Sequence, residues 1–338
     1  MRVLYGIQCT GNGHITRSIN IINELRKHVT VDVVTSGSHS EVPIPFTVKY
    51  RLSGLSYYFG KNGSYDFWRT LTKNNVFRFI REVRKIPIQK YDLVVSDFEP
   101  ITSWAAMRND VFCAHVSNQA ALLNKKVPKQ LIINPFAKLM LRYFCPADKR
   151  YGLFYQKYGD QTFFPPIRDE VKGLSVADHG YYVVYLPFYS DERIVDELAK
   201  FSEVKWKVYS KHTNAEYVKD NIEVYPISAK FTKDMALASG VLCSAGFGTT
   251  AEALYLGKKL FVIPMRNQFE QQCNAYALEK LGVRSCKSLT NGSDSIAAWL
   301  ADDTIPAVRI KDDVRRLTQQ ILTDYINDHG ARQLEFSS

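Results

Sequence analysis

Residues 241–282 read VLCSAGFGTTAEALYLGKKLFVIPMRNQFEQQCNAYALEKLG, and this stretch decides the fold. The pattern predicts an apolar strand, a glycine-containing turn, a helix, a second buried strand, a loop and a second helix. Thr249 or Thr250 can cap the first helix, and Gly257 marks its end. Because strands and helices alternate on both sides of this stretch, we expect parallel, doubly wound sheets with helices on both faces.

The turn between the first strand and the first helix predicts a binding site for an anion. Gly246 and Gly248 tolerate unusual dihedral angles and let a ligand approach the backbone closely. A helix that begins behind such a turn offers free N–H groups and the positive end of its dipole. Glu252 in this helix, and Glu270 and Gln271 in the next, add groups that bind sugar hydroxyls. The arrangement suits a nucleotide diphosphate that carries a sugar.

The same residues resemble the donor-binding half of GT-B glycosyltransferases, which include the lipid II-forming N-acetylglucosaminyl transferases and the UDP-glycosyltransferases. In that class a turn of the form Gly-x-x-(Ser/Thr)-x-x-Glu leads into a helix, and Gly246, Thr249 and Glu252 occupy these positions here. The resemblance implies that Glu252 binds the ribose hydroxyls. It also implies that the Glu270-Gln271 pair, which precedes Asn274-Ala275, binds the donor sugar.

Three alternatives to a transferase compete for this turn. Gly246, Gly248 and Ala251 also satisfy the Gly-x-Gly-x-x-Ala form of the dinucleotide-binding fingerprint, which would indicate a nucleotide-dependent oxidoreductase. That fingerprint normally follows the first strand of its domain, whereas several strands precede it here. A second alternative is a non-catalytic protein that binds a sugar nucleotide. A third is that the glycines only pack a helix against a sheet, which leaves the ordered Glu252 and Glu270 unexplained.

The N-terminal residues predict a second part of the site, facing the glycine turn at Gly246. An apolar strand over residues 2–7 leads into the turn CTGNGH, which ends at His14, and a helix is expected from Ile15 to Lys27. His14 therefore projects from the carboxyl end of the first strand, where α/β sheets build their sites. A lone histidine is more often a hydrogen-bonded bystander, but this turn resembles the first loop of the GT-B enzymes. The resemblance implies that His14 is the catalytic base and that Gly13 lies against the donor phosphates.

A second strand supplies a partner for His14. Residues 93–96 predict a strand that ends at Asp97, and the resemblance implies that this carboxylate orients the histidine. Glu99 is a rival, and a helix cap or a loop carboxylate is the alternative role for Asp97. The donor-binding set expected from both turns is Gly13, Ser244, Gly246, Phe247, Gly248, Thr249, Thr250, Glu252, Glu270 and Gln271.

The length of 338 residues suits two domains, and the resemblance implies two doubly wound Rossmann-like domains that face a cleft, the GT-B plan. We expect an acceptor-binding domain over residues 1–165, a linker over 166–180 and a nucleotide-sugar-binding domain over 181–310. A helix over 311–327 would return to the first domain, followed by a polar tail to residue 338. The expected strands are residues 2–7, 29–35, 46–50, 93–96, 111–114, 181–186, 205–209, 222–225, 241–243 and 260–263.

Composition bounds the location and the chemistry. The six cysteines form no C-x-x-C pair and there is no histidine cluster at ligand spacing, so we expect a reduced cytoplasmic compartment and no bound metal. The chain begins with a strand instead of a signal segment, and no apolar run is long enough to span a bilayer. A cytoplasmic protein, peripheral on the inner face of a membrane, fits these observations.

The formal net charge of +10 is concentrated in the first domain. Cations alternate with aromatic and aliphatic residues over 61–69 and 77–85, and again between Lys125 and Arg142. Such a surface suits an anionic membrane or a phosphorylated lipid acceptor. Nucleic acid ranks lower because no nucleic-acid motif is present, and a solvated amphipathic helix explains the pattern equally well.

The sequence therefore predicts a glycosyltransferase that uses a nucleotide sugar, with a UDP-sugar as the first candidate. The resemblance implies an inverting enzyme, and retaining enzymes, which share this fold, are the alternative. His14 would deprotonate the acceptor hydroxyl of a glycolipid, a glycan or a small molecule. The helix behind Gly246 would stabilise the leaving diphosphate in place of a metal ion, and no cofactor is expected. The loop Pro187-Phe188-Tyr189 departs from the glycine- or serine-rich turn often found there in the class.

Overall fold

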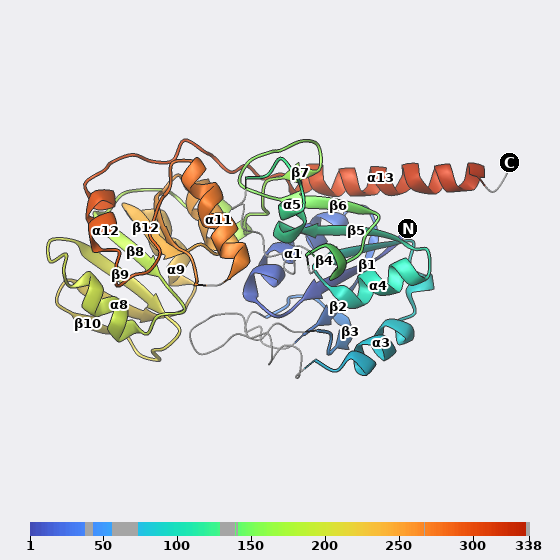
Figure 1. The fold of residues 1–338 in the computed structure, drawn as a ribbon, viewed down its shortest axis with the longest axis horizontal. Helices are drawn as coiled ribbons and strands as arrows, with labels where there is room; N and C mark the ends of the chain where they lie inside the picture. Colours follow the sequence, from blue (N-terminus) through green and yellow to red (C-terminus); the bar gives the residue numbers. More distant parts are fainter. Residues whose placement is uncertain (38–42, 56–73, 129–138, 140, 267, 336–338) are drawn as a thin grey trace.

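The protein is a two-sheet α/β structure in the computed structural model, which describes residues 1–37, 43–55, 74–128, 139, 141–266 and 268–335. Each sheet has seven strands in the described part of the chain. Figure 1 shows the two sheets side by side, the first in blue to green and the second in yellow to orange, with the C-terminal helix α13 (Val314–Glu335) lying along the first. The prediction of two Rossmann-like α/β domains is confirmed.

The first sheet has the strand order β3-β2-β1-β4-β5-β6-β7, and neighbouring strands are parallel throughout. Its strands are buried on both faces at the centre because apolar side chains meet helices on either side; all five residues of β4 are buried. The strands are β1 Arg2–Gln8, β2 Thr30–Ser36, β3 Val48–Leu52, β4 Leu93–Asp97, β5 Phe112–Ser117, β6 Lys149–Leu153 and β7 Thr162–Phe163.

The helices of this half are α1 Asn12–Leu25, α3 Val76–Lys85, the 3₁₀ turn η1 Ile88–Lys90, α4 Pro100–Arg108 and α5 Asn118–Leu122. The chain order reverses between β1 and β4, and a reversal of this kind opens a crevice at the carboxyl ends of the two strands. Ile7 of β1 lies opposite Asp97 of β4, so the turns that follow these strands are neighbours.

The second sheet has the order β10-β11-β9-β8-β12-β13-β14, with β10–β11 as its antiparallel pair. Its strands are β8 Tyr181–Tyr185, β9 Lys205–Ser210, β10 Tyr217–Lys219, β11 Ile222–Pro226, β12 Gly240–Ser244, β13 Lys259–Ile263 and β14 Arg284–Ser285. The helices are α8 Asp191–Leu198, α9 Lys230–Leu237, α10 Phe247–Tyr255, α11 Phe269–Lys280 and α12 Ser293–Leu300. Here the order reverses between β8 and β12, immediately before α10.

The two halves are joined by residues 164–180, which include the short helix α7 Asp169–Lys172, and by the return of α13. Helix α13 packs against α1, and Tyr151 of β6 donates a hydrogen bond to Asp324 of α13 at 2.8 Å. This helix extends to Glu335, beyond the expected end at residue 327. One continuous cluster of buried apolar residues runs from the first sheet through Tyr155 and Ile167 into the second.

Candidate active site

The first glycine turn lies where β1 ends and α1 begins. Gly11 is the N-cap of α1 in an extended conformation, and Gly13 is in the first turn of the helix. A Cβ atom at either position would meet nothing within 4 Å. The packing of the chain therefore does not require these two glycines, and the space beside them is open to a ligand.

His14 is held by groups from two elements. Its Nδ1 atom lies 2.8 Å from Oδ1 of Asp97, at the end of β4, as the sequence predicted for their positions. The Asp97 carboxylate is fully buried and also binds Arg17 and Ser18 of α1; Arg17 Nε donates to Oδ2 at 2.7 Å and Ser18 Oγ donates to the same oxygen at 3.0 Å. Burial alone would raise the pKa of Asp97, but the charge of Arg17 and the contact with His14 lower that pKa to about 2. Asp97 is therefore a carboxylate at any physiological pH.

Glu99, the rival acid, has a different position. Its side chain caps α4: Oε1 accepts from the N–H of Ile101 at 2.9 Å, and Oε2 accepts from the N–H of Thr102 at 2.7 Å. Gly6 of β1 makes room for this cap, because a Cβ there would lie 2.4 Å from Oγ1 of Thr102. Both oxygens of Glu99 are engaged away from His14, so the geometry favours Asp97 as the partner of the histidine.

Phe98 lies between Asp97 and Glu99 and has an unusual backbone conformation, which directs these two carboxylates to different partners. Its φ of 54° lies in the left-handed region, which is uncommon for a residue with a bulky side chain. The Phe98 ring is stacked against His14, with centroids 6.2 Å apart and an angle of 10° between the planes. This contact places an aromatic ring beside the imidazole.

The second glycine turn joins β12 to α10. Gly246 is the N-cap of α10, and because glycine has no side chain that could cap the helix, the first N–H groups of the helix remain available to a ligand. A Cβ at Gly246 would meet only Ser244 Oγ, at 3.7 Å, and one at Gly248 would meet nothing within 4 Å. The alternative that these glycines pack the helix against the sheet is therefore wrong.

Buried contacts fix the start of α10. Thr250 Oγ1 donates to the carbonyl of Gly246 at 2.8 Å and lies 2.7 Å from the hydroxyl of Tyr155, which also packs its ring 5.1 Å from that of Phe247. Asn274 of α11 donates to the carbonyl of Ala245 at 3.0 Å. The expected donor residues Ser244, Phe247 and Thr250 are buried, Thr249 is half-buried, and Gly248 is exposed.

Three of the predicted polar residues already have partners in the chain. Both oxygens of Glu252 accept from Arg168, at 2.6 Å from Nε and 2.8 Å from Nη2. Glu270 Oε2 accepts from Gln119 Nε2 at 2.7 Å, a hydrogen bond that crosses between the two halves. Gln271 is turned inward, and its Oε1 accepts from the N–H of Met265 at 2.9 Å.

The two turns face each other. Helix α1 contacts α10, Gln119 reaches Glu270, and Tyr155 reaches Thr250. The negative charge of Glu270 also acts on Arg17, which places α11 within electrostatic reach of the His14 cluster. These contacts bring a candidate base and the N-termini of α1 and α10 together where the two halves meet, and we call this region the crevice.

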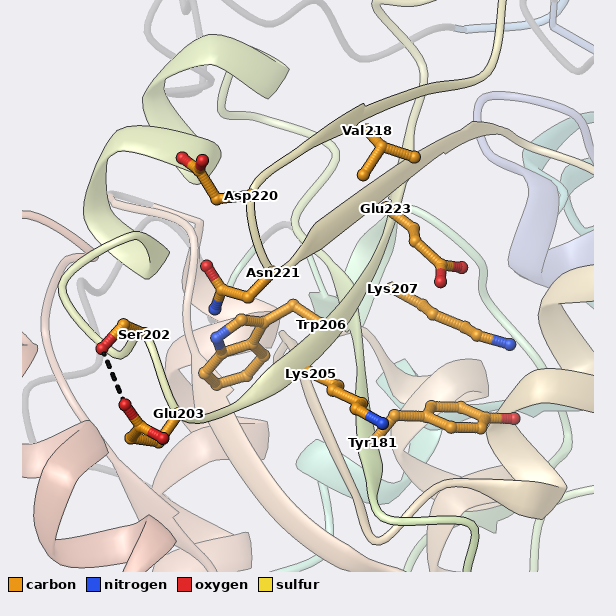
Figure 2. Close-up of a pocket in the computed structure, with 10 residues that line it drawn as sticks. All are labelled: Tyr181, Ser202, Glu203, Lys205, Trp206, Lys207, Val218, Asp220, Asn221 and Glu223. Carbon is orange, nitrogen blue, oxygen red and sulfur yellow. Dashed lines mark hydrogen bonds between the residues drawn. The ribbon is translucent and has the colours of Figure 1, made fainter.

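A separate surface hollow of about 370 Å³ lies on the second sheet and is drawn in Figure 2. The hollow lies at the starts of three strands: Tyr181 begins β8, Lys205 begins β9, and Asn221 immediately precedes β11. The glycine turns instead follow the carboxyl ends of their strands. Lys207 in this hollow is paired with Asp234 at 3.1 Å. The hollow therefore lies at the amino ends of the strands, whereas the crevice lies at their carboxyl ends.

The reversal points of the two sheets and the paired glycine turns define a class of protein, the GT-B glycosyltransferases. The chain belongs to glycosyl transferase family 1, whose family model matches residues 1–302. It is therefore an enzyme of the glycosyltransferase class, and the resemblance seen in the sequence is confirmed at that level. Family membership favours the transferase over the oxidoreductase.

Solved glycosyltransferases share the whole fold at low sequence identity. The kitacinnamycin glycotransferase is 14% identical with a TM-score of 0.63, over 97% of this chain and 95% of that chain. MurG of Acinetobacter baumannii is 12% identical with a TM-score of 0.61, over 96% and 100%. The spinosyn rhamnosyltransferase SpnG is 12% identical with a TM-score of 0.56, over 99% and 100%. No curated protein sequence matches the chain.

The sequence did not indicate several residues of the crevice, among them Arg17, Gln119, Tyr155 and Arg168. Arg17 could have been found, because it stands three residues after His14 and so shares its side of a helix. The other three contact residues more than 80 positions away, and no local pattern marks them.

Within the described residues, no group of three metal-ligating side chains comes together, and no helix is long and apolar enough to cross a membrane.

Proposed function

We propose that the protein transfers a sugar from a nucleotide-sugar donor, with a UDP-sugar as the first candidate, to an acceptor hydroxyl with inversion at the anomeric carbon. The observation that carries this proposal is the pair of facing glycine turns. No atom of the chain occupies the space beside the backbone of Gly13 and Gly248, so a ligand can approach it. Nucleotide diphosphates need such backbone, because their phosphates bind N–H groups at helix N-termini.

His14 is the proposed base. With its Nδ1–H donated to Asp97, the imidazole presents the lone pair of Nε2, which can accept the proton of the acceptor hydroxyl. The acceptor oxygen then attacks the anomeric carbon from the face opposite the diphosphate. The start of α10 would stabilise the charge that develops on the leaving diphosphate, and this contribution supports a metal-independent reaction.

The acceptor is proposed to be associated with a membrane. Helix α3 carries exposed apolar side chains at Val76, Phe77 and Ile80, and Phe77 is 87% exposed. Exposed cations follow on the same helix at Arg81, Arg84 and Lys85. An exposed phenylalanine followed by exposed cations on the same helix fits the interface of an anionic bilayer. Of the two other basic segments predicted, residues 61–69 lie outside the described residues, as do Lys129 and Lys138 of the segment between Lys125 and Arg142.

A panel of nucleotides tests the donor class. Thermal unfolding should be measured with UDP, other nucleoside diphosphates, several UDP-sugars, NADH and NADPH. A ligand at a hundred times its dissociation constant adds about 2.7 kcal/mol to the free energy of unfolding, which is a clear rise in Tm. We expect a UDP-sugar to give this rise; stabilisation by NADH or NADPH alone would contradict the proposal.

A further inference from the structure

The Nδ1 atom of His14 lies between an anion and a cation. Oδ1 of Asp97 is 2.8 Å away, and Nη2 of Arg17 is 2.7 Å away. Arg17 also binds both oxygens of the same carboxylate, through Nε and Nη2. Its guanidinium is 8% exposed and His14 is 15% exposed, so water screens these charges only partly.

Nδ1 can satisfy only one of these neighbours at a time. If it carries the hydrogen and donates to Asp97, Nε2 has a free lone pair and can take a proton. If Nδ1 instead accepts from Arg17, the hydrogen is on Nε2 and the ring cannot act as a base there. Asp97 therefore favours the tautomer with the hydrogen on Nδ1, in which Nε2 can act as a base. Arg17 binds the same carboxylate and so competes with His14 for it.

The protonated ring is subject to the same competition. Asp97 stabilises the imidazolium, whereas the positive charge of Arg17 opposes it at the same atom. The titratable and charged groups around His14 come from five elements: Arg17 of α1, Tyr5 of β1, Asp97 of β4, His115 of β5 and Glu270 of α11. Burial and the charge of Arg150 lower the pKa of His115 to about 3, so His115 adds no charge at neutral pH.

We propose that Arg17 is a positioning residue that keeps His14 neutral until it receives the acceptor's proton. By neutralising part of the Asp97 charge and standing beside Nδ1, it prevents the carboxylate from holding His14 as a cation. In the reaction the proton moves to Nε2, the acceptor oxygen bonds to the anomeric carbon, and the bond from that carbon to the diphosphate breaks with its electron pair on the diphosphate. The inference rests on the proposed function, in which His14 is the base.

The test is the pH dependence of kcat/KM together with the NMR titration of the His14 ring. Arg17→Gln should move the acidic limb of the profile, and the ring titration with it, to higher pH by about one unit. The double variant Arg17→Gln with Asp97→Asn should return both toward the wild-type position, because the unopposed carboxylate is gone. Lys27→Gln removes an exposed cation from the same end of the chain and should move neither.

Two outcomes would overturn the inference. One is a profile for Arg17→Gln that is lowered equally at every pH with an unchanged ring titration, which would mean that Arg17 only packs. If Arg17→Gln does not fold because it leaves the buried Asp97 charge unpaired, the double variant, which removes that charge as well, is compared with Asp97→Asn. The proposal then predicts that His14 titrates at higher pH in the double variant, and equal titration would reject it. The ring titration needs no turnover, so it separates this inference from the proposal that His14 is the base.

Discussion

At the scale of a single residue, Glu252 has one contact that the structure shows and one that only the resemblance implies. The resemblance to GT-B enzymes implies a hydrogen bond to the ribose, while the structure shows a bidentate ion pair with Arg168. If the carboxylate binds the ribose, Glu252→Gln should weaken UDP binding by about 1–3 kcal/mol, as measured by calorimetry. Arg168→Gln is the matched control: it removes the ion pair, keeps the carboxylate, and should leave UDP binding equal or tighter. Equal losses in both variants would assign Glu252 to the ion pair alone.

Single residues were predictable where topology alone brings them together. His14 and Asp97 follow neighbouring parallel strands, so the alternation of strands and helices was sufficient to place them at one edge. The ion pair of Glu252 was not predictable, because Arg168 lies 84 positions earlier in a segment without strand or helix periodicity. The role of Glu99 as a cap depends on the left-handed backbone of Phe98, which no sequence pattern indicated.

The glycine turns provide a test at the scale of elements. Gly248 is in the first turn of α10, its φ is not left-handed, and a Cβ there would meet no atom of the chain within 4 Å. Gly248→Ala should therefore keep the free energy of unfolding or raise it by up to about 1 kcal/mol, because alanine favours helix. The same methyl group should obstruct the donor phosphates and weaken UDP-sugar binding at least about tenfold, which corresponds to 1.4 kcal/mol.

Calorimetry and thermal unfolding of Gly248→Ala decide between the two interpretations of this turn. Gly173→Ala is the control, because that glycine ends α7, has a negative φ of −85°, and belongs to neither glycine turn. Unchanged donor binding in Gly248→Ala would move the phosphate site away from the start of α10.

Helix α3 provides the second test at this scale. Replacing Arg81, Arg84 and Lys85 by Gln should reduce binding to anionic liposomes in a sedimentation assay, and binding of the wild type should fall as salt rises. Phe77→Ser should reduce binding to the same liposomes at high salt as well, since its contribution is apolar. The control replaces three exposed cations of the second half by Gln: Lys200, Lys205 and Lys211. Equal binding to neutral and anionic vesicles would instead identify α3 as a solvated helix.

The apolar strands, including the edge strand β3, were predictable, whereas β6, β7, β10 and β14 were not, for a physical reason. Central strands such as β4 are buried on both faces and appear as apolar runs. Strand β6 begins with Lys149 and Arg150, and β14 has two residues, so neither shows an apolar run or an alternating pattern. Hydrogen bonds to a neighbouring strand, and not local sequence, make them part of their sheets.

At the scale of the whole molecule, the site depends on how the two halves meet. The contacts that join them link residues far apart in sequence: Gln119 and Glu270 are separated by 151 positions, and Tyr155 and Thr250 by 95. The length of the chain suited two domains, and the resemblance to GT-B enzymes implied a cleft between them, but the sequence could not predict these pairs. They matter because His14 is on one half and the start of α10 is on the other, so neither half alone can hold a donor against a base.

The proposed function requires His14 to act as the base of a sugar transfer across this crevice. The measurement that tests it most directly is the rate of UDP release from the stabilising UDP-sugar with a working acceptor, compared between wild type and His14→Ala. General-base loss predicts a fall in turnover of roughly 10²–10⁴-fold, with UDP affinity nearly unchanged because Gly246 and Gly248 are untouched. Asp97→Asn should give a smaller fall in the same direction. Near-normal turnover in a folded His14→Ala variant would contradict the account.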